Sequence, residues 1–250
     1  MRKPLIAGNW KMNLDRASAL ALVAALREAV GTKTDVDVAV YPPFVYLGDV
    51  LRALDGSPIA VGAQNCCDQT SGAFTGEISA AMLADVGAQS VLLGHSERRH
   101  VYGEQDDLVH RKVLAALGAG LAVVLCVGET LAERQENSTE KVIGRQLTRG
   151  LEGVPARDLA RLTVAYEPVW AIGTGHNATP EQASQAHAYL RGVLSSLYGE
   201  AEAARIRILY GGSVKPSNVG ALRTASDVDG CLVGGASIQI DTFLPLLRYR

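Results

Sequence analysis

The residue best placed for chemistry is Glu167, an acid at the end of the β-type segment 162–167. The segment after it, 168–175, contains Val-Trp-Ala-Ile but is bounded by Pro and Gly. Loops that run over the surface are usually polar, so an apolar loop with rigid ends indicates a lid that folds over a site. A carboxylate under such a lid loses water and becomes a stronger base. The alternative is a structural acid paired with a neighbouring loop.

Two glycine pairs follow two other β-type runs. One precedes Ser213, after the run 206–210, and the other is Gly234 and Gly235, after the run 230–233. Glycine lets an anion approach the backbone amides, and the start of a following helix adds a favourable dipole. Either pair alone could be a tight turn. Two pairs in consecutive strand-to-helix connections indicate a phosphate site.

Four further polar residues, Asn9, Lys11, His95 and Glu97, follow predicted strands. His95 begins a short helical turn, where the local dipole favours a neutral imidazole. Lys11 could balance a substrate phosphate and developing negative charge, and Asn9 could add a hydrogen bond. A surface histidine and a solvated lysine are the alternatives. With Glu167, this set predicts proton abstraction next to the carbonyl of a small phosphorylated substrate.

The elements that must position these residues are short apolar runs that alternate with helical patterns. Near-continuous apolar runs are typical of strands buried on both faces of a parallel sheet. The predicted strands are 5–10, 37–41, 59–63, 90–94, 122–127, 162–167, 206–210 and 230–233. The predicted helices are 16–30, 44–54, 77–86, 106–117, 140–151, 182–198, 215–222 and 238–247.

Eight such pairs in 250 residues predict a closed (β/α)8 TIM barrel, in the α/β class, as a single domain over 1–250. The alternative, an open doubly wound sheet, usually shows a Gly-rich turn after its first strand. Residues 8–11 read Gly-Asn-Trp-Lys, which is not that turn. In a barrel the active site lies at the C-terminal strand ends, where all the residues above are found.

The composition favours a compact soluble protein. Hydrophobic residues make up 48% and charged residues 20%. The net charge of -2 does not indicate binding to nucleic acid or to an anionic membrane. The four cysteines form no Cys-x-x-Cys and predict reduced thiols, and the sequence contains no metal or cofactor motif. The N-terminus lacks a signal-peptide core, and the longest apolar run, 121–127, is too short to span a bilayer. We therefore expect a cytoplasmic protein.

The chain resembles the triosephosphate isomerase family from residue 5 to the last helix. The motifs that carry the resemblance are GNWKMN at 8–13, AFTGEIS at 73–79, GHSERR at 94–99, AYEPVW at 165–170 and the two glycine-pair loops. The resemblance implies interconversion of dihydroxyacetone phosphate and D-glyceraldehyde 3-phosphate through an enediolate, without a cofactor, in glycolysis and gluconeogenesis.

Roles for single residues follow from the same resemblance. Glu167 would be the base that moves the proton between two carbons, and His95 the neutral electrophile that moves protons between the oxygens. Lys11 and Asn9 would polarise the substrate. Glu97 would support Lys11 or take part in proton transfer.

The phosphate site and the lid are also implied by the resemblance. The phosphate would be held by the backbone amides of Gly173, Ser213, Gly234 and Gly235. Ile172 and Leu232 would form an apolar clamp that desolvates Glu167. Tyr210 and Ser213 would fasten the closed lid by hydrogen bonds to its far end.

The lid starts at Pro168, and by the same resemblance Glu129 would hold Trp170 while the lid is open. The far end of the lid departs from the family. The family commonly has Lys-Thr or a similar pair after Gly175, whereas this chain has His-Asn at 176–177. No catalytic group is lost, so the difference concerns how fast the lid opens and whether it responds to pH.

A homodimer is the expected assembly. In the family, the long loop that corresponds to 65–77 reaches into the neighbouring subunit and places Thr75 near Asn9 and Lys11. The apolar Phe74 within this loop is consistent with insertion into a partner.

Two other functions compete with this interpretation. A sugar-phosphate isomerase of the histidine or tryptophan pathways would need a paired acid and base on opposite sides, and His95 with a single lidded Glu167 fits less well. A catalytically silent barrel could act as a scaffold. Every candidate catalytic position holds the needed residue type, which argues against the scaffold.

Overall fold

The structure is a computed structural model that describes residues 2–32, 35–172 and 178–248. The predicted phosphate ligand Gly173 and the His-Asn pair at 176–177 lie outside the described residues. Predictions that concern them are therefore not tested by this structure.

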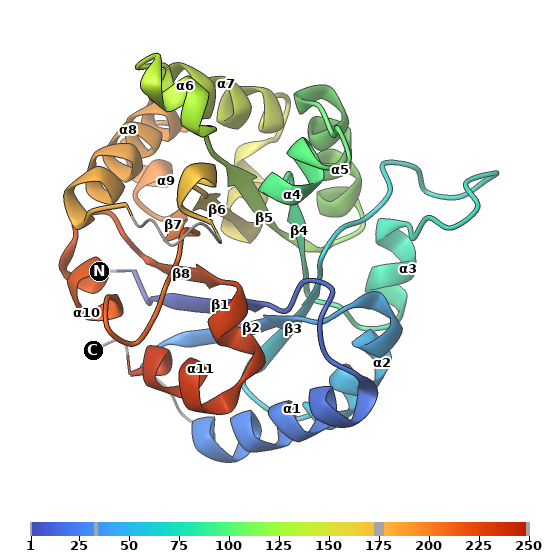
Figure 1. Ribbon diagram of the computed structural model, residues 1–250. Coiled ribbons are helices and arrows are strands. Elements are labelled where there is room, and N and C mark those ends of the chain that lie inside the picture. Colours follow the sequence, from blue (N-terminus) through green and yellow to red (C-terminus); the bar gives the residue numbers. More distant parts are fainter. Residues whose placement is uncertain (1, 33–34, 173–177, 249–250) are drawn as a thin grey trace.

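Eight parallel strands form a closed barrel in sequence order, and β1 pairs with both β2 and β8 (Figure 1). The closed (β/α)8 barrel predicted from the sequence is confirmed. The strands are β1 (Leu5–Asn9), β2 (Asp37–Tyr41), β3 (Ile59–Ala63), β4 (Ser90–Leu93), β5 (Ala122–Val127), β6 (Leu162–Tyr166), β7 (Arg207–Tyr210) and β8 (Gly230–Val233).

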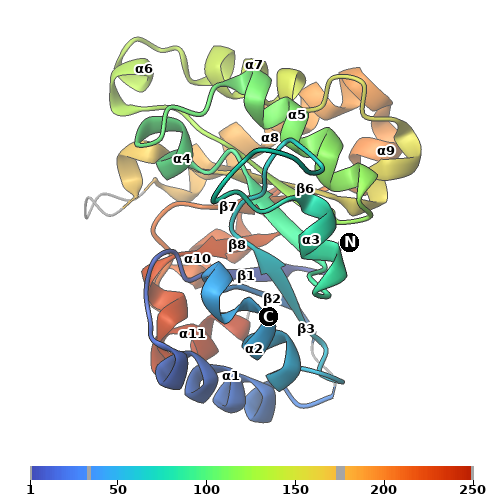
Figure 2. The ribbon, with the colours of Figure 1, turned by 90° about the vertical axis from the view of Figure 1, so that its right-hand side faces the viewer.

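The helices surround the barrel (Figures 1 and 2). They are α1 (Arg16–Val30), α2 (Phe44–Ala53), α3 (Ala80–Asp85), α4 (Ser96–His100), α5 (Asp106–Gly118), α6 (Leu131–Gln135), α7 (Thr139–Gly150), α8 (Pro180–Tyr198), α9 (Glu200–Ala203), α10 (Val219–Thr224) and α11 (Ile240–Leu247). Within the described residues, three short 3₁₀ helices are η1 (Ala156–Arg161), η2 (Val169–Ala171) and η3 (Gly235–Ile238). In the described ranges, no helix is both long and apolar enough to cross a membrane.

The predicted starts of α3 and α10 were wrong because side chains cap the backbone later in the sequence. The Ser79 hydroxyl accepts the amide hydrogen of Met82, so α3 begins after Ser79 and not at residue 77. Asn218 accepts from the Lys215 amide and donates to the Ser213 carbonyl, which closes a turn before α10 can start. Other predicted boundaries differ by one or two residues: the starts of α7, α8, α11 and β7, and the ends of α2, α3, α5, α7, α10, β1, β4 and β6.

Two apolar layers hold the barrel together. Residues that point inward along the strands, such as Ala7, Tyr41 and Leu209, form the interior core. The residues between them pack outward against the helices and form the larger cluster. A strand with both faces buried must be apolar throughout, which explains the continuous runs in the sequence. At Gly62 a Cβ atom would lie 2.4 Å from the Tyr41 ring, so this glycine makes room for a large interior side chain.

His187 in α8 is a fully buried histidine that packs edge-on against the Tyr166 ring. Its Nδ1 lies 3.0 Å from the Asp227 carbonyl oxygen, and its Nε2 is buried with no hydrogen-bond partner among the described residues. Nδ1 therefore carries the hydrogen. Burial lowers the pKa of His187 from 6.5 to about 4, so the folded protein keeps this ring neutral.

We expect His187 to make the protein less stable in acid. Between pH 6.5 and about 4 the unfolded chain binds a proton that the folded chain does not, so stability falls as pH falls. The loss from this one group is about 3 kcal/mol. Denaturant unfolding across this range should show a weaker pH dependence in His187→Gln than in the wild type. The exposed His100, changed to Gln as a control, should leave the dependence as it is. Equal slopes in the wild type and His187→Gln would contradict the assignment.

Candidate active site

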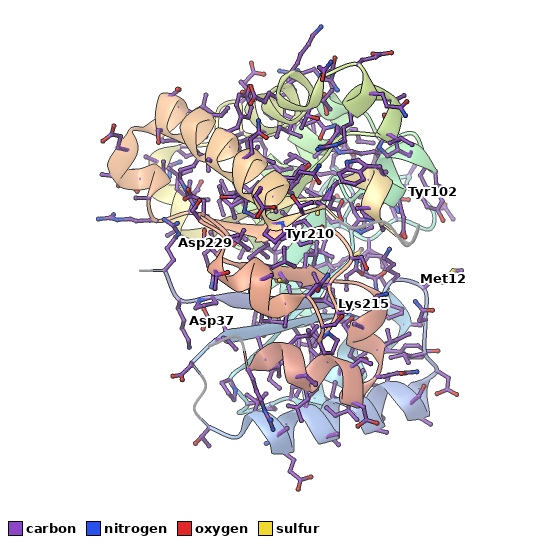
Figure 3. All side chains as sticks on the ribbon, turned by 60° about the vertical axis from the view of Figure 1, so that its left-hand side comes forward. Met12, Asp37, Tyr102, Tyr210, Lys215 and Asp229 are labelled. Carbon is purple, nitrogen blue, oxygen red and sulfur yellow. The ribbon has the colours of Figure 1, made fainter. Side chains whose placement is uncertain are left out.

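A cavity of about 700 Å³ opens at the C-terminal ends of the strands. In Figure 3, Asp37 and Asp229, which lie at or next to strand starts, are at one end of the barrel. Met12 and Lys215, which follow strand ends, lie toward the other end. Predicted site residues that line the cavity are Asn9, Lys11, His95, Glu167, Ile172, Ser213, Leu232, Gly234 and Gly235. The fold therefore brings together residues from five separate strand ends.

Glu167 is almost fully buried and lies directly after β6. Its Oε2 accepts the amide hydrogen of Ser96 at 2.8 Å, and its Oε1 lies 3.0 Å from His95 Nε2. Burial acts to raise the pKa of Glu167, but His95, the Ser96 amide and Lys11 outweigh it and hold the pKa below its ordinary value. The side chain is therefore a carboxylate that can accept a proton.

His95 caps α4 and presents its second nitrogen to the cavity. Its Nδ1 accepts the amide hydrogen of Glu97 at 3.2 Å, a bond that requires a neutral ring with the hydrogen on Nε2. Burial lowers the pKa of His95, and the nearby Glu167 carboxylate more than offsets this, so the net shift is upward. A substrate between the two side chains would remove their direct contact and leave burial, which favours the neutral ring.

Lys11 is held at the cavity in a left-handed backbone conformation, with φ 52°. That conformation costs about 1–2 kcal/mol for a residue other than glycine. Hydrogen bonds from the Lys11 amide to Asn9 Oδ1 (3.0 Å) and from Gln64 to the Lys11 carbonyl (2.8 Å) hold it in place. Its ammonium lies 2.6 Å from Glu97. Glu97 is half exposed and does not line the cavity, so its position favours support of Lys11.

The two glycine pairs serve different purposes. A Cβ atom at Gly211 would lie 2.8 Å from Glu167 Cγ, and one at Gly212 would lie 2.2 Å from the Tyr210 hydroxyl. The first pair therefore makes room for site side chains. At Gly235, which begins η3, a Cβ atom would meet open space. The backbone at Gly235 is thus free for an anion to approach.

The described part of the predicted lid begins at Pro168 and contains η2. Trp170 donates a hydrogen bond from Nε1 to Glu129 Oε1 at 2.9 Å. Burial raises the pKa of Tyr210 to about 12, although the Ala178 backbone acts to lower it. The Tyr210 hydroxyl has no hydrogen-bond partner of normal geometry among the described residues. The fastening of the lid through Tyr210 and Ser213 stays a prediction.

Sequence reasoning missed several residues. Gln64 follows β3, so the rule that strand ends carry the site could have found it. The remaining cavity-lining residues belong to no motif in the sequence, and only their position after the last two strands could have indicated them. They are Val214, Lys215, Pro216, Ser217, Ala236, Gln239 and Thr242.

Thr75 is exposed on the segment between β3 and α3, which projects from the barrel (Figure 1). It does not line the cavity of its own chain, so its expected place near Asn9 and Lys11 of another subunit stays a prediction. The four cysteines are buried and unpaired. Among the described residues, no cluster of three or more His, Cys, Asp or Glu could hold a metal ion.

Comparison with known proteins gives one consistent result. The family model described as Triosephosphate isomerase matches residues 4–250. The chain is 48% identical over 250 residues to the triosephosphate isomerase of Syntrophotalea carbinolica, with 100% of this chain and 99% of that protein covered. It is 50% identical over 250 residues to that of Geobacter metallireducens, with both chains fully covered. It is 49% identical over 248 residues to that of Carboxydothermus hydrogenoformans, with 99% of each chain covered.

Proposed function

The chain belongs to the triosephosphate isomerase family and is an isomerase that interconverts triose phosphates, and from this premise we propose that Glu167 is its catalytic base. The observation that carries the proposal is the buried, ionised carboxylate of Glu167, 3.0 Å from His95 Nε2. Both side chains line one cavity with Lys11 and the glycine-pair loops. A base and a hydrogen-bond donor at one substrate-sized site suit proton transfer next to a carbonyl.

In the proposed reaction, Glu167 removes a proton from C1 of dihydroxyacetone phosphate, and the electron pair moves to the C2 carbonyl oxygen. His95 donates its Nε2 hydrogen toward that oxygen, and the Lys11 ammonium stabilises the negative charge. The proton on Glu167 then returns to C2, and a proton passes from the C1 oxygen to the C2 oxygen. The product is D-glyceraldehyde 3-phosphate, with no net gain or loss of electrons.

The phosphate of the substrate would bind the amides of Ser213, Gly234 and Gly235, with Gly173 as a fourth ligand. Support comes from the open space at Gly235 and from the position of all three described residues on the cavity wall. Their backbone N–H groups and the start of η3 provide donors without a formal charge. Asn9 would add a side-chain hydrogen bond.

The apolar clamp is supported by Ile172 and Leu232, which line the cavity with Glu167. When the lid from Pro168 closes, these side chains would exclude water from the carboxylate and strengthen it as a base. The apolar side chains of the lid would in this way contribute to the basicity of Glu167.

A coupled assay that starts from dihydroxyacetone phosphate and follows D-glyceraldehyde 3-phosphate tests the function. Turnover is expected for the purified chain. No turnover would overturn the proposal and favour a different sugar phosphate or a silent scaffold. The place in glycolysis and gluconeogenesis follows from the family, and the cytoplasmic location stays a prediction.

We further propose that the protein is a homodimer in which the loop 65–77 inserts into the partner and brings Thr75 to the partner's site. The loop projects from the barrel, and its Phe74 is 45% exposed. Other large hydrophobic side chains are exposed as well, at Met12, Val45, Met82, Val86, Val101 and Tyr102. A second copy would bury Phe74 at the tip of the projecting loop.

Phe74→Asp is expected to dissociate the dimer, because the insertion would bury an unpaired charge. Sedimentation should then show the mass of one chain where the wild type shows two. Leu197→Asp, an exposed leucine at the end of α8, is the matched control and should leave the mass unchanged. A wild type that sediments as a monomer would rule out the proposed assembly.

A further inference from the structure

Glu129 is a fully buried carboxylate at the base of the lid. Its Oε1 receives hydrogen bonds from the Trp170 indole at 2.9 Å, the Tyr166 hydroxyl at 3.1 Å and Arg134 at 3.2 Å. Its Oε2 has no hydrogen-bond partner in the part of the chain that the structure describes. A buried charge is costly unless it is paired. The ion pair with the Arg134 guanidinium therefore offsets part of the cost of burying the Glu129 carboxylate.

Arg134 also contacts the lid directly. Its guanidinium carbon lies 4.6 Å from the centre of the Trp170 ring, within the range of a cation–π interaction. The side chain is 27% exposed, so water screens the contact only partly. Trp170 is therefore held at its N–H edge by Glu129 and on its face by Arg134.

The element that carries Arg134 has stabilising hydrogen bonds of its own. The short helix α6 starts with a capping box in which Thr130 and Glu133 satisfy each other's backbone amides. The lid in turn is joined to this region by a hydrogen bond from the Val169 amide to the Glu129 carbonyl, at 3.1 Å. Arg134 thus lies on a capped helix outside the lid, and Trp170 lies on the segment expected to move.

We propose that Arg134 is a positioning residue that sets the balance between the Trp170 position seen here and the closed lid. The inference rests on the proposed function, in which the lid closes over a phosphorylated substrate. If closure breaks the bond between Trp170 and Glu129, the carboxylate keeps Tyr166 and Arg134 as partners. The cation–π contact would be lost with the ring, so Arg134 favours the position of Trp170 seen here.

The expected size of the effect is modest and measurable. A cation–π contact at a partly exposed site changes an equilibrium constant by about two- to fivefold. If the closed lid is the minor state of the free protein, its population should rise by that factor when the contact is removed. The affinity for a ligand that requires closure rises by the same factor.

Fluorine NMR of protein labelled with 5-fluorotryptophan can test this, because the chain has two tryptophans. Trp170 reports on the lid, and the fully buried Trp10 is an internal control for folding. Arg134→Gln removes the charge, and Arg134→Lys keeps a charge but loses the planar guanidinium. Arg145→Gln is the matched control, since Arg145 is an ion-paired arginine on α7 that lies 2.9 Å from Asp106.

In Arg134→Gln without ligand, the Trp170 resonance should move toward its position in wild type saturated with 2-phosphoglycolate. The Kd for 2-phosphoglycolate and the KM should both fall by about two- to fivefold. Arg134→Gln also leaves the buried Glu129 carboxylate without its ion pair. Arg134→Lys keeps a positive charge beside Glu129 and should give a smaller change of the same sign, so it decides the question. Arg145→Gln should match the wild type.

An unmoved Trp170 resonance or weaker ligand binding in folded Arg134→Lys would overturn the assignment. Failure of the proposed function would look different. The wild type itself would then neither bind 2-phosphoglycolate nor convert triose phosphates, whatever residue stands at position 134.

Discussion

Glu167→Gln is expected to lower kcat by at least about 100-fold, the usual minimum for loss of a general base. Gln has nearly the same shape, and its amide oxygen can still accept the Ser96 hydrogen bond. It cannot take up a proton, so the chemical step fails while substrate binding is retained. The coupled assay should show a large fall in kcat and a small change in KM.

A second observable links this variant to His95. The Glu167 carboxylate raises the pKa of His95, so replacing it should lower that pKa, which a histidine NMR titration can follow. Glu181→Gln, an exposed glutamate in the first turn of α8, is the matched control and should keep wild-type kcat. A kcat for Glu167→Gln within about threefold of the wild type would reject Glu167 as the base.

His95→Gln is expected to lower kcat by about 100- to 1000-fold, the range seen when one donor to a developing oxyanion is removed. Gln can donate a hydrogen bond but cannot pass protons between the two substrate oxygens. His95 also helps to lower the pKa of Glu167 against the effect of burial. Its removal should therefore shift the acid limb of the kcat/KM profile to higher pH, because Glu167 must be ionised to act.

The exposed His100 on the same helix α4 provides the control for this variant. His100→Gln should reproduce the wild-type profile in both height and position. If His95→Gln kept the wild-type acid limb together with a wild-type kcat, the contact between His95 and Glu167 would have no part in the reaction.

Much of the barrel could be predicted from the sequence because burial on both faces of a strand leaves a continuous apolar run. The run 122–127 matches β5 to the residue. The two helix starts that are furthest from the prediction lie where a single side chain decides the boundary. Ser79 and Asn218 delay the helices they precede, and only their hydrogen bonds reveal this. Short helices such as α6 have too few residues for a periodic pattern to be seen.

One geometric rule, that the strand ends of a barrel meet in space, predicts the polar centre of the candidate site, and the lid and clamp residues follow from the family resemblance. Glu167, His95 and Lys11 obey this rule, and Gln64 could have been found by it. Arg134 could not, because it precedes Trp170 by 36 positions in the sequence and meets it only through the fold.

The most direct test of the central claim is turnover of dihydroxyacetone phosphate in D2O, with deuterium located by NMR. Proton transfer through Glu167 exposes the moving proton to solvent exchange, so the wild type should place deuterium at C2 of D-glyceraldehyde 3-phosphate and at C1 of recovered substrate. Glu167→Gln should slow this incorporation as much as it slows turnover. Product and substrate both free of deuterium, together with wild-type turnover by Glu167→Gln, would instead mean that hydrogen moves directly between the carbons, which contradicts a carboxylate base.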